Sequence, residues 1–172
     1  EATVKAVANA LYAMGNVSIG EESRFYFSSN VGSGVKAGGL TLGKGARVFA
    51  QGALGGVAVT RSDLVLNENS VLDANTAKNY NALKCEGTLV MREGAKLIAN
   101  NGGEYHGAEI SALSIEGTVN IEARGGAKGV GLFLFSLEED YAVVGFCEPA
   151  PRFEVGRGSL LFYASAAEIP TP

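Results

Sequence analysis

MREGAKLIA, residues Met91–Ala99, is the stretch that decides the fold, because four close copies of it recur along the chain. The other copies are Ile19–Phe27 (IGEESRFYF), Leu42–Ala50 (LGKGARVFA), Leu66–Ala74 (LNENSVLDA) and Ile115–Ala123 (IEGTVNIEA). Successive copies begin 23, 24, 25 and 24 residues apart. Self-similarity at a fixed period of this size indicates stacked structural units rather than one conventional globular core.

Each period contains three short strand patterns separated by turns. In one period, the apolar segment 82–85 (ALKC) and the triplet 89–91 (LVM) precede the last strand of the nine-residue copy. The triplets alternate between two faces, and no segment sustains the spacing of an amphipathic helix over three turns. Equivalent strands can therefore stack in parallel at about 4.8 Å. The sequence predicts an all-β, single-stranded, right-handed parallel β-helix of about five to six coils, each about 22–26 residues long.

Alignment of the periods predicts columns of inward side chains in which small columns face large ones, an arrangement that fills a narrow tube without voids. The columns are Ala13, Ala37, Val59, Cys85 and Ile110; Val17, Leu40, Leu64, Leu89 and Leu113; Ile19, Leu42, Leu66, Met91 and Ile115; Phe25, Val48, Leu72, Leu97 and Ile121; and Phe27, Ala50, Ala74, Ala99 and Ala123. Sharp corners are expected at Glu22, Gly45, Asn69, Gly94 and Thr118, where Gly and Asn fit a left-handed backbone.

The two ends depart from the repeat. Residues 2–9 are compatible with a helix, but their likeness to the copy near Ala95 favours a strand of an earlier coil. Residues 1–135 are assigned to the coils, and 136–172 to a β-rich cap and the start of a linker, all within one domain. Strand-like patterns within 141–165 alternate but do not fit the repeat register. A cap is expected because an open last coil leaves unpaired strand groups and bare apolar side chains.

Composition excludes several classes of function. The net charge of -4 argues against a nucleic-acid partner, which would require a basic face. No apolar run reaches the length of a membrane span. The chain begins at Glu1 without Met and ends in EIPTP, which predicts a piece of a longer chain.

Motifs for chemistry are missing. The single His106 and the three aspartates (Asp63, Asp73 and Asp140) have no metal-ligand spacing and are expected to be solvated, so no metal or cofactor is predicted. The carboxylates and cations of the later coils are expected to form surface ladders, as in a Lys84–Glu109 pair, and not a catalytic cluster. They are Glu86, Glu93, Glu109, Glu116, Glu122, Lys84, Arg92 and Arg124. The sequence therefore predicts no catalytic residues and no enzyme.

The two cysteines are too few for a disulfide framework. Cys85 falls in an inward column and is expected to be buried and free, while Cys147 lies in the cap segment. A disulfide between them depends on geometry that the sequence does not contain.

One outward column is partly aromatic. Tyr26, Phe49 and Ile98 align on it, interrupted by Asp73 and Glu122. Tyr105 is expected near it on the rim, with Tyr12 and Tyr80 on the strand face or rim. Aromatic side chains on a rigid face can stack on sugar rings, so Tyr26, Phe49, Ile98 and Tyr105 are the predicted ligand-binding residues. The alternative is that the cap folds back over the column and buries it.

Segments 10–19 (ALYAMGNVSI), 34–50 (GVKAGGLTLGKGARVFA) and 82–101 (ALKCEGTLVMREGAKLIANN) resemble the repeats of secreted bacterial proteins described as carbohydrate-binding domain-containing. The likeness covers about residues 10–123. It implies a right-handed β-helix, extracellular or cell-surface placement and glycan binding, although no ligand residue transfers by motif.

These observations predict a non-catalytic extracellular or cell-surface solenoid that binds a glycan or surface ligand along one face. Two alternatives remain open. One is a rigid spacer or stalk of a larger adhesin-like protein, and the other is an enzyme similar to polysaccharide lyases or glycoside hydrolases.

Overall fold

The computed structural model describes residues 1–6, 8–78 and 80–134 with their side chains, and the strands at 143–146, 153–155 and 160–162 by their backbone. Within these residues every regular element is a β-strand and all strand pairing is parallel. The predicted parallel β-helix is therefore confirmed, with about five turns.

The strands form two sheets, called sheet A and sheet B. Sheet A consists, in order, of β1 (Ala2–Ala6), β4 (Arg24–Ser29), β7 (Arg47–Gly52), β10 (Val71–Thr76), β12 (Lys96–Asn101), β14 (Val119–Arg124) and β17 (Phe153–Val155). Sheet B contains β2 (Leu11–Tyr12), β3 (Asn16–Ile19), β5 (Val35–Ala37), β6 (Gly39–Leu42), β8 (Val57–Val59), β9 (Leu64–Leu66), β11 (Leu83–Arg92), β13 (Ala108–Glu116), β15 (Leu132–Leu134), β16 (Val143–Phe146) and β18 (Leu160–Phe162).

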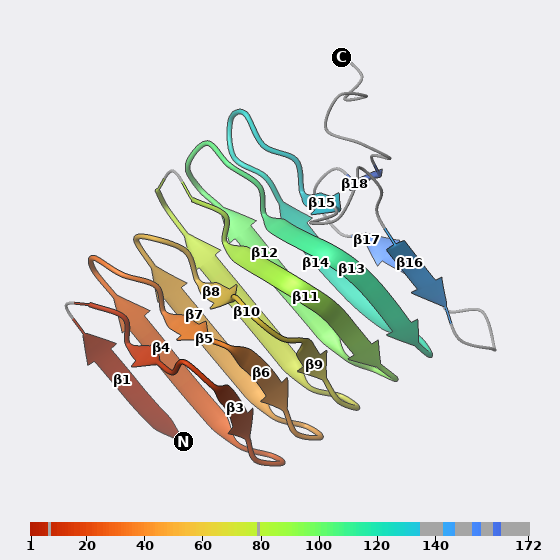
Figure 1. Cartoon of the computed structure of the whole chain (residues 1–172), viewed down its shortest axis with the longest axis horizontal. Helices are drawn as coiled ribbons and strands as arrows, with labels where there is room; N and C mark the ends of the chain where they lie inside the picture. The colour runs from red at the N-terminus through yellow and green to blue at the C-terminus, as the bar shows by residue number, and fades with distance from the viewer. Residues whose placement is uncertain (7, 79, 135–142, 147–152, 156–159, 163–172) are drawn as a thin grey trace.

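The two sheets form facing layers, and each coil crosses both of them (Figure 1). The chain runs along sheet B, turns a tight corner into sheet A, and returns through a looser loop to sheet B one coil further on. We call the edge that carries these looser loops the rim. The core is the single tube of apolar side chains between the sheets.

The predicted inward columns are confirmed by the strand register. Leu89 pairs with Leu64 on one side and Leu113 on the other, and all three side chains are buried. The small column is equally regular, since Ala74 lies between Ala50 and Ala99 and has no exposed surface. Sheet A thus contributes this small column beside a large one that includes Leu72 and Leu97, and the mixture of sizes keeps the interior closely packed.

Two sheets, rather than three separate ladders, surround the core. The first two strand patterns of each coil both belong to sheet B, and in β11 and β13 they merge into one long strand. The β11–β13 ladder continues through the corner with one irregularity between Cys85 and Thr88.

The sharp corners between the sheets lie at the predicted positions in four coils. Glu22, Gly45, Asn69 and Gly94 all have positive φ, between 53° and 70°. Each of their amide groups donates to a carbonyl of the following coil, so the corners stack along the tube. In the fifth coil the prediction of Thr118 is wrong, because the positive φ of 98° belongs to Gly117. Glycine lacks the Cβ that makes this conformation costly for a β-branched residue.

Both ends extend the stack. Residues 2–6 form β1 and pair in register with β4, so the strand prediction is correct for them and the helix alternative is wrong. The expectation that the segment around 141–165 leaves the register is wrong for its described strands. Val144 pairs with Leu113, and β17 and β18 continue sheets A and B. Because residues 135–142 stand between β15 and β16, these strands do not recur at the period of the earlier coils, and aligning the periods does not reveal their register.

The rest of the predicted cap, including its expected boundary at 135/136 and any fold-back over the outer column, lies outside the described residues.

Candidate functional site

The predicted outward column is present on the outer surface of sheet A. The register places Thr3, Tyr26, Phe49, Asp73, Ile98 and Glu122 on successive strands in that order. Tyr26 and Phe49 form a tilted aromatic pair with ring centroids 6.1 Å apart. The Tyr26 side chain remains 42% exposed. The aromatic part of the column is therefore concentrated on β4 and β7.

Hollows flank this aromatic pair on both sides. One, of about 220 Å³, includes Arg24, Arg47 and Asp73 in its lining together with the two rings. The other, of about 320 Å³, extends over β1 and is lined by polar side chains beside the rings. We call this surface the aromatic face, and define it by Thr3, Lys5, Arg24, Tyr26, Ser28, Arg47, Phe49 and Gln51, with the carboxylates of Asp73 and Glu1 at its edges.

The aromatic face is basic. Arg24 and Arg47 lie opposite each other on β4 and β7, and both are exposed. Among the described residues, neither arginine nor Lys5 forms an ion pair. Like charges opposite one another on neighbouring strands repel, and among the described residues no carboxylate forms an ion pair with either arginine to offset this repulsion.

Asp73 closes the aromatic face on the side of β10. Its carboxylate accepts a hydrogen bond of 2.6 Å from the Asn75 side-chain amide. Burial raises the pKa of Asp73, an effect that the Asn75 hydrogen bond and the Lys96 charge partly oppose. A half-buried carboxylate here separates the aromatic pair from Ile98.

Two of the predicted ligand residues are not assembled with the aromatic pair. Ile98 is half-buried in the column between Asp73 and Glu122. Tyr105 is 50% exposed but lies in a rim loop. The buried Asn101 fixes that loop by donating to the carbonyls of His106 and Tyr80, at 3.0 and 2.7 Å.

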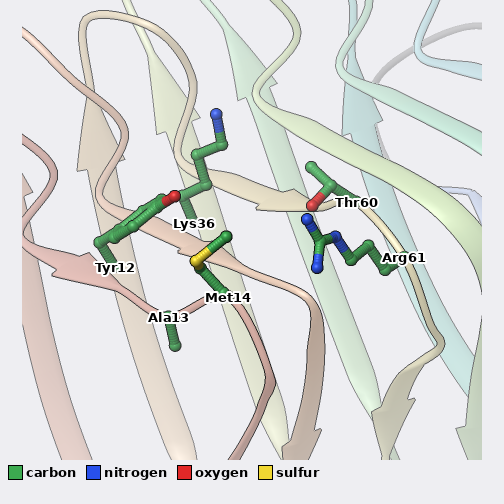
Figure 2. Close-up of a pocket in the computed structure, with 6 residues that line it drawn as sticks. All are labelled: Tyr12, Ala13, Met14, Lys36, Thr60 and Arg61. Carbon is green, nitrogen blue, oxygen red and sulfur yellow. The ribbon is translucent and has the colours of Figure 1, made fainter.

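A separate hollow of about 310 Å³ lies on sheet B at the same end of the solenoid (Figure 2). Tyr12 and Met14 are 58% and 63% exposed there. Figure 2 shows the Arg61 guanidinium extending toward Met14, with Lys36 next to Tyr12. Of these residues, sequence reasoning singled out only Tyr12.

The predicted carboxylates and cations of the later coils pair along the surface. The Lys84 ammonium lies 3.8 Å from Glu109, which confirms the predicted ladder pair, and 3.2 Å from Glu86. Arg92 pairs with Glu116 at 3.2 Å. The Lys84–Glu109 and Arg92–Glu116 pairs follow strand register across β11 and β13 and act as cross-strand contacts, whereas Lys84 and Glu86 lie on the same strand.

The remaining two glutamates are also engaged. The Glu122 carboxylate lies 2.5 Å from the Lys96 ammonium on sheet A, and the Glu93 carboxylate accepts the Thr118 amide at 2.7 Å. Arg124, at the end of β14, is exposed.

The expectation that His106 is solvated is wrong. Its ring stacks on Phe133 with centroids 4.7 Å apart, and Nδ1 accepts the Val130 amide at 3.1 Å. Burial lowers the pKa of His106, and Glu109 partly opposes this. A neutral ring that accepts a backbone hydrogen bond anchors one rim loop to the next.

Cys85 is buried and free, as predicted, and burial raises the pKa of its thiol to about 11. Cys147 lies outside the described residues. In the described part of the chain, no group of three or more His, Cys, Asp or Glu side chains could hold a metal ion. No helix within that part is long and apolar enough to cross a membrane.

The fold and this surface define a parallel β-helix that carries a basic aromatic strip on the outside of its first coils. No family model, curated protein or solved structure matches the chain.

Sequence reasoning missed Arg24 and Arg47 as members of the site, although a signal was present. Each stands two residues before an outward aromatic residue, at the same position of its nine-residue copy. Side chains two apart on a strand share a face. The repeat alignment therefore contains the arginine pair beside Tyr26 and Phe49.

Proposed function

We propose that this protein is a non-catalytic glycan-binding solenoid of an extracellular or cell-surface protein, and that the sugar lies across the aromatic face. The observation that carries the proposal is the pair formed by the exposed Tyr26 and the half-buried Phe49, with hollows of about 220 and 320 Å³ beside it. Aromatic rings supply large apolar contact on which the C–H faces of sugar rings can stack.

The surroundings of the aromatic pair suit a sugar. Ser28 and Gln51 line the larger hollow and offer hydrogen-bonding groups to sugar hydroxyls. Both stand on strands held on two sides by parallel neighbours. A face fixed in this way loses little conformational entropy when a ligand binds.

A rigid spacer within a larger surface protein is the second candidate. The unbroken parallel register from β4 through β14 favours it, because a stack of coils in register resists bending. A spacer requires no ligand, so binding measurements separate the two functions.

A glycan-array screen with the purified protein tests the proposal, using Phe49→Ala and Tyr80→Ala as a matched pair. Tyr80 is a rim aromatic residue with 52% of its surface exposed. We expect array signals that fall for Phe49→Ala and persist for Tyr80→Ala. A blank array with well-folded protein would favour the spacer, and equal losses in both variants would remove the ligand from the aromatic face.

A further inference from the structure

We propose that the glycan bound by the aromatic face is acidic, and that Arg24 and Arg47 together hold its carboxylate or sulfate groups. This inference rests on the proposed function, and adds the chemical class of the ligand. The sugar ring stacks on Tyr26 and Phe49, and its acidic group lies in the hollow of about 220 Å³ beside the arginines.

The first argument is the position of the two arginines. Arg24 and Arg47 are direct partners across β4 and β7, so their backbones are about 4.8 Å apart. Their side chains line one hollow. Arginine presents a planar fork of donors that matches carboxylate and other oxyanions, so one acidic group between the two side chains can bind both. Such a group would also relieve the repulsion between them.

The second argument is the distribution of ion pairs. Every ion pair among the described residues lies between Lys84 and Lys128. The contrast is clear on sheet A itself. Lys96 occupies the same register position as Arg47, two strands further on, and is paired with Glu122 at 2.5 Å. Lys84, Arg92, Lys96 and Lys128 of the later coils are paired, whereas Lys5, Arg24 and Arg47 on the aromatic face have no ion-pair partner among the described residues.

The third argument concerns the direction in which an acidic ligand would extend over the aromatic face. Asp73 borders the hollow on the β10 side, where its carboxylate would repel an acidic ligand. Lys5 lies at the opposite edge, over β1, where it lines the second hollow together with Glu1. An acidic chain is therefore expected to extend from the arginine pair toward Lys5 and to avoid the Glu1 carboxylate.

The chain as a whole has a net charge of -4, so a polyanion has no general attraction to it. Binding would have to come from this local basic patch. The patch is also where the Tyr26–Phe49 pair lies, which favours a polysaccharide over an acidic polymer without rings. Single-stranded nucleic acid also combines rings and charge, so it enters the test as a competitor.

The experiment measures affinity by calorimetry for two matched polymer pairs: alginate against carboxyl-reduced alginate, and dextran sulfate against dextran. Each pair keeps the sugar backbone and removes the acid, and the two pairs distinguish carboxylate from sulfate. Poly(dT) is included as a nucleic-acid probe. We expect one acidic polymer to bind and its neutral form to bind at least about tenfold more weakly, as charge-assisted hydrogen bonds allow.

Four variants locate the binding. Arg24→Gln and Arg47→Gln should each weaken acidic-polymer binding by about tenfold, since each loses a charged donor. Lys44→Gln removes one exposed positive charge from the corner of the same coil and should change affinity less than about twofold, as rim charges do. Arg61→Gln, in the sheet B hollow, should behave like Lys44→Gln.

Three outcomes would overturn the inference while leaving glycan binding intact or relocated. Equal affinity for acidic and neutral forms, lost in Phe49→Ala, would keep the proposed function and remove the acid requirement. Loss of acidic-polymer binding in Arg61→Gln alone would place the acidic group in the sheet B hollow instead. Equal losses of affinity in all four variants would mean that binding reflects nonspecific electrostatic attraction and not the arginine pair. Tighter binding of poly(dT) would overturn both proposals. No binding of any polymer would overturn the acidic-ligand inference, and the glycan array would then decide the proposed function by itself.

Discussion

Replacing Leu89 with alanine should lower the free energy of unfolding by about 3 kcal/mol, within the range found for buried Leu→Ala substitutions. Leu89 has no exposed surface and lies between Leu64 and Leu113 in the middle of its column. The ladders on both sides hold the surrounding backbone, so the cavity cannot collapse freely. Val90, the next residue, points outward and is only half-buried. Val90→Ala is the matched control, with an expected cost below about 1 kcal/mol.

The assay is equilibrium urea unfolding followed by far-ultraviolet circular dichroism. A loss of about 3 kcal/mol is a large share of the 5–15 kcal/mol that typical domains possess, so the midpoint shift will be plain. The slope of the transition should stay unchanged if the coils unfold together. Equal costs for Leu89→Ala and Val90→Ala, or a larger cost for Val90→Ala, would refute the inward register.

Three further predictions concern packing and pH. Gly56→Ala should lower the free energy of unfolding by about 1–3 kcal/mol, because an added Cβ would collide with backbone atoms of neighbouring strands. Gly15→Ala is the control, since a Cβ there meets nothing within 4 Å. In calorimetry, the control should leave the midpoint of thermal unfolding unchanged. Asp73→Asn should stabilise the protein at neutral pH. Because the pKa of Asp73 is raised in the folded state, Asp73 contributes to the free energy of unfolding below its ordinary pKa of 3.8, and this contribution is lost as the pH rises through the folded-state pKa. The stability of Asp73→Asn, measured by urea unfolding across a pH series, should not show that loss. The lowered pKa of His106 has the opposite sign. His106 contributes to the free energy of unfolding above its ordinary pKa of 6.5, and this contribution is lost as the pH falls through the lowered folded-state pKa. His106→Gln should therefore lose less thermal stability on acidification. An unchanged dependence of thermal stability on pH would contradict the burial of a neutral His106 ring.

The tube could be predicted from the sequence because burial repeats with the period. Each inward position requires an apolar side chain in every coil, and Leu40, Leu64 and Leu89 satisfy this at nearly constant spacing. A β-strand alternates strictly between two faces, so the same alignment also gave the outward order of Tyr26 and Phe49.

The surroundings of individual side chains were harder to predict, because they depend on loops of neighbouring coils. His106 reads as a solvated loop residue until Val130 and Phe133, from the next coil, are placed against it. Tyr105 reads as a neighbour of the outer column, yet it lies in the rim loop between β12 and β13 and is not part of the lining of either hollow beside the aromatic pair. The arginine pair was overlooked because charge alone does not show which cations lack a partner.

The most direct test of the binding face is an amide chemical-shift titration by nuclear magnetic resonance, using the oligosaccharide that gives the strongest array signal. The chain of 172 residues is small enough for residue-by-residue assignment. We expect the largest shifts on β1, β4 and β7, around Arg24, Tyr26 and Phe49. Shifts concentrated around Tyr12 and Lys36 on sheet B, or on β12 and β14, would contradict the assignment of the aromatic face as the ligand-binding surface.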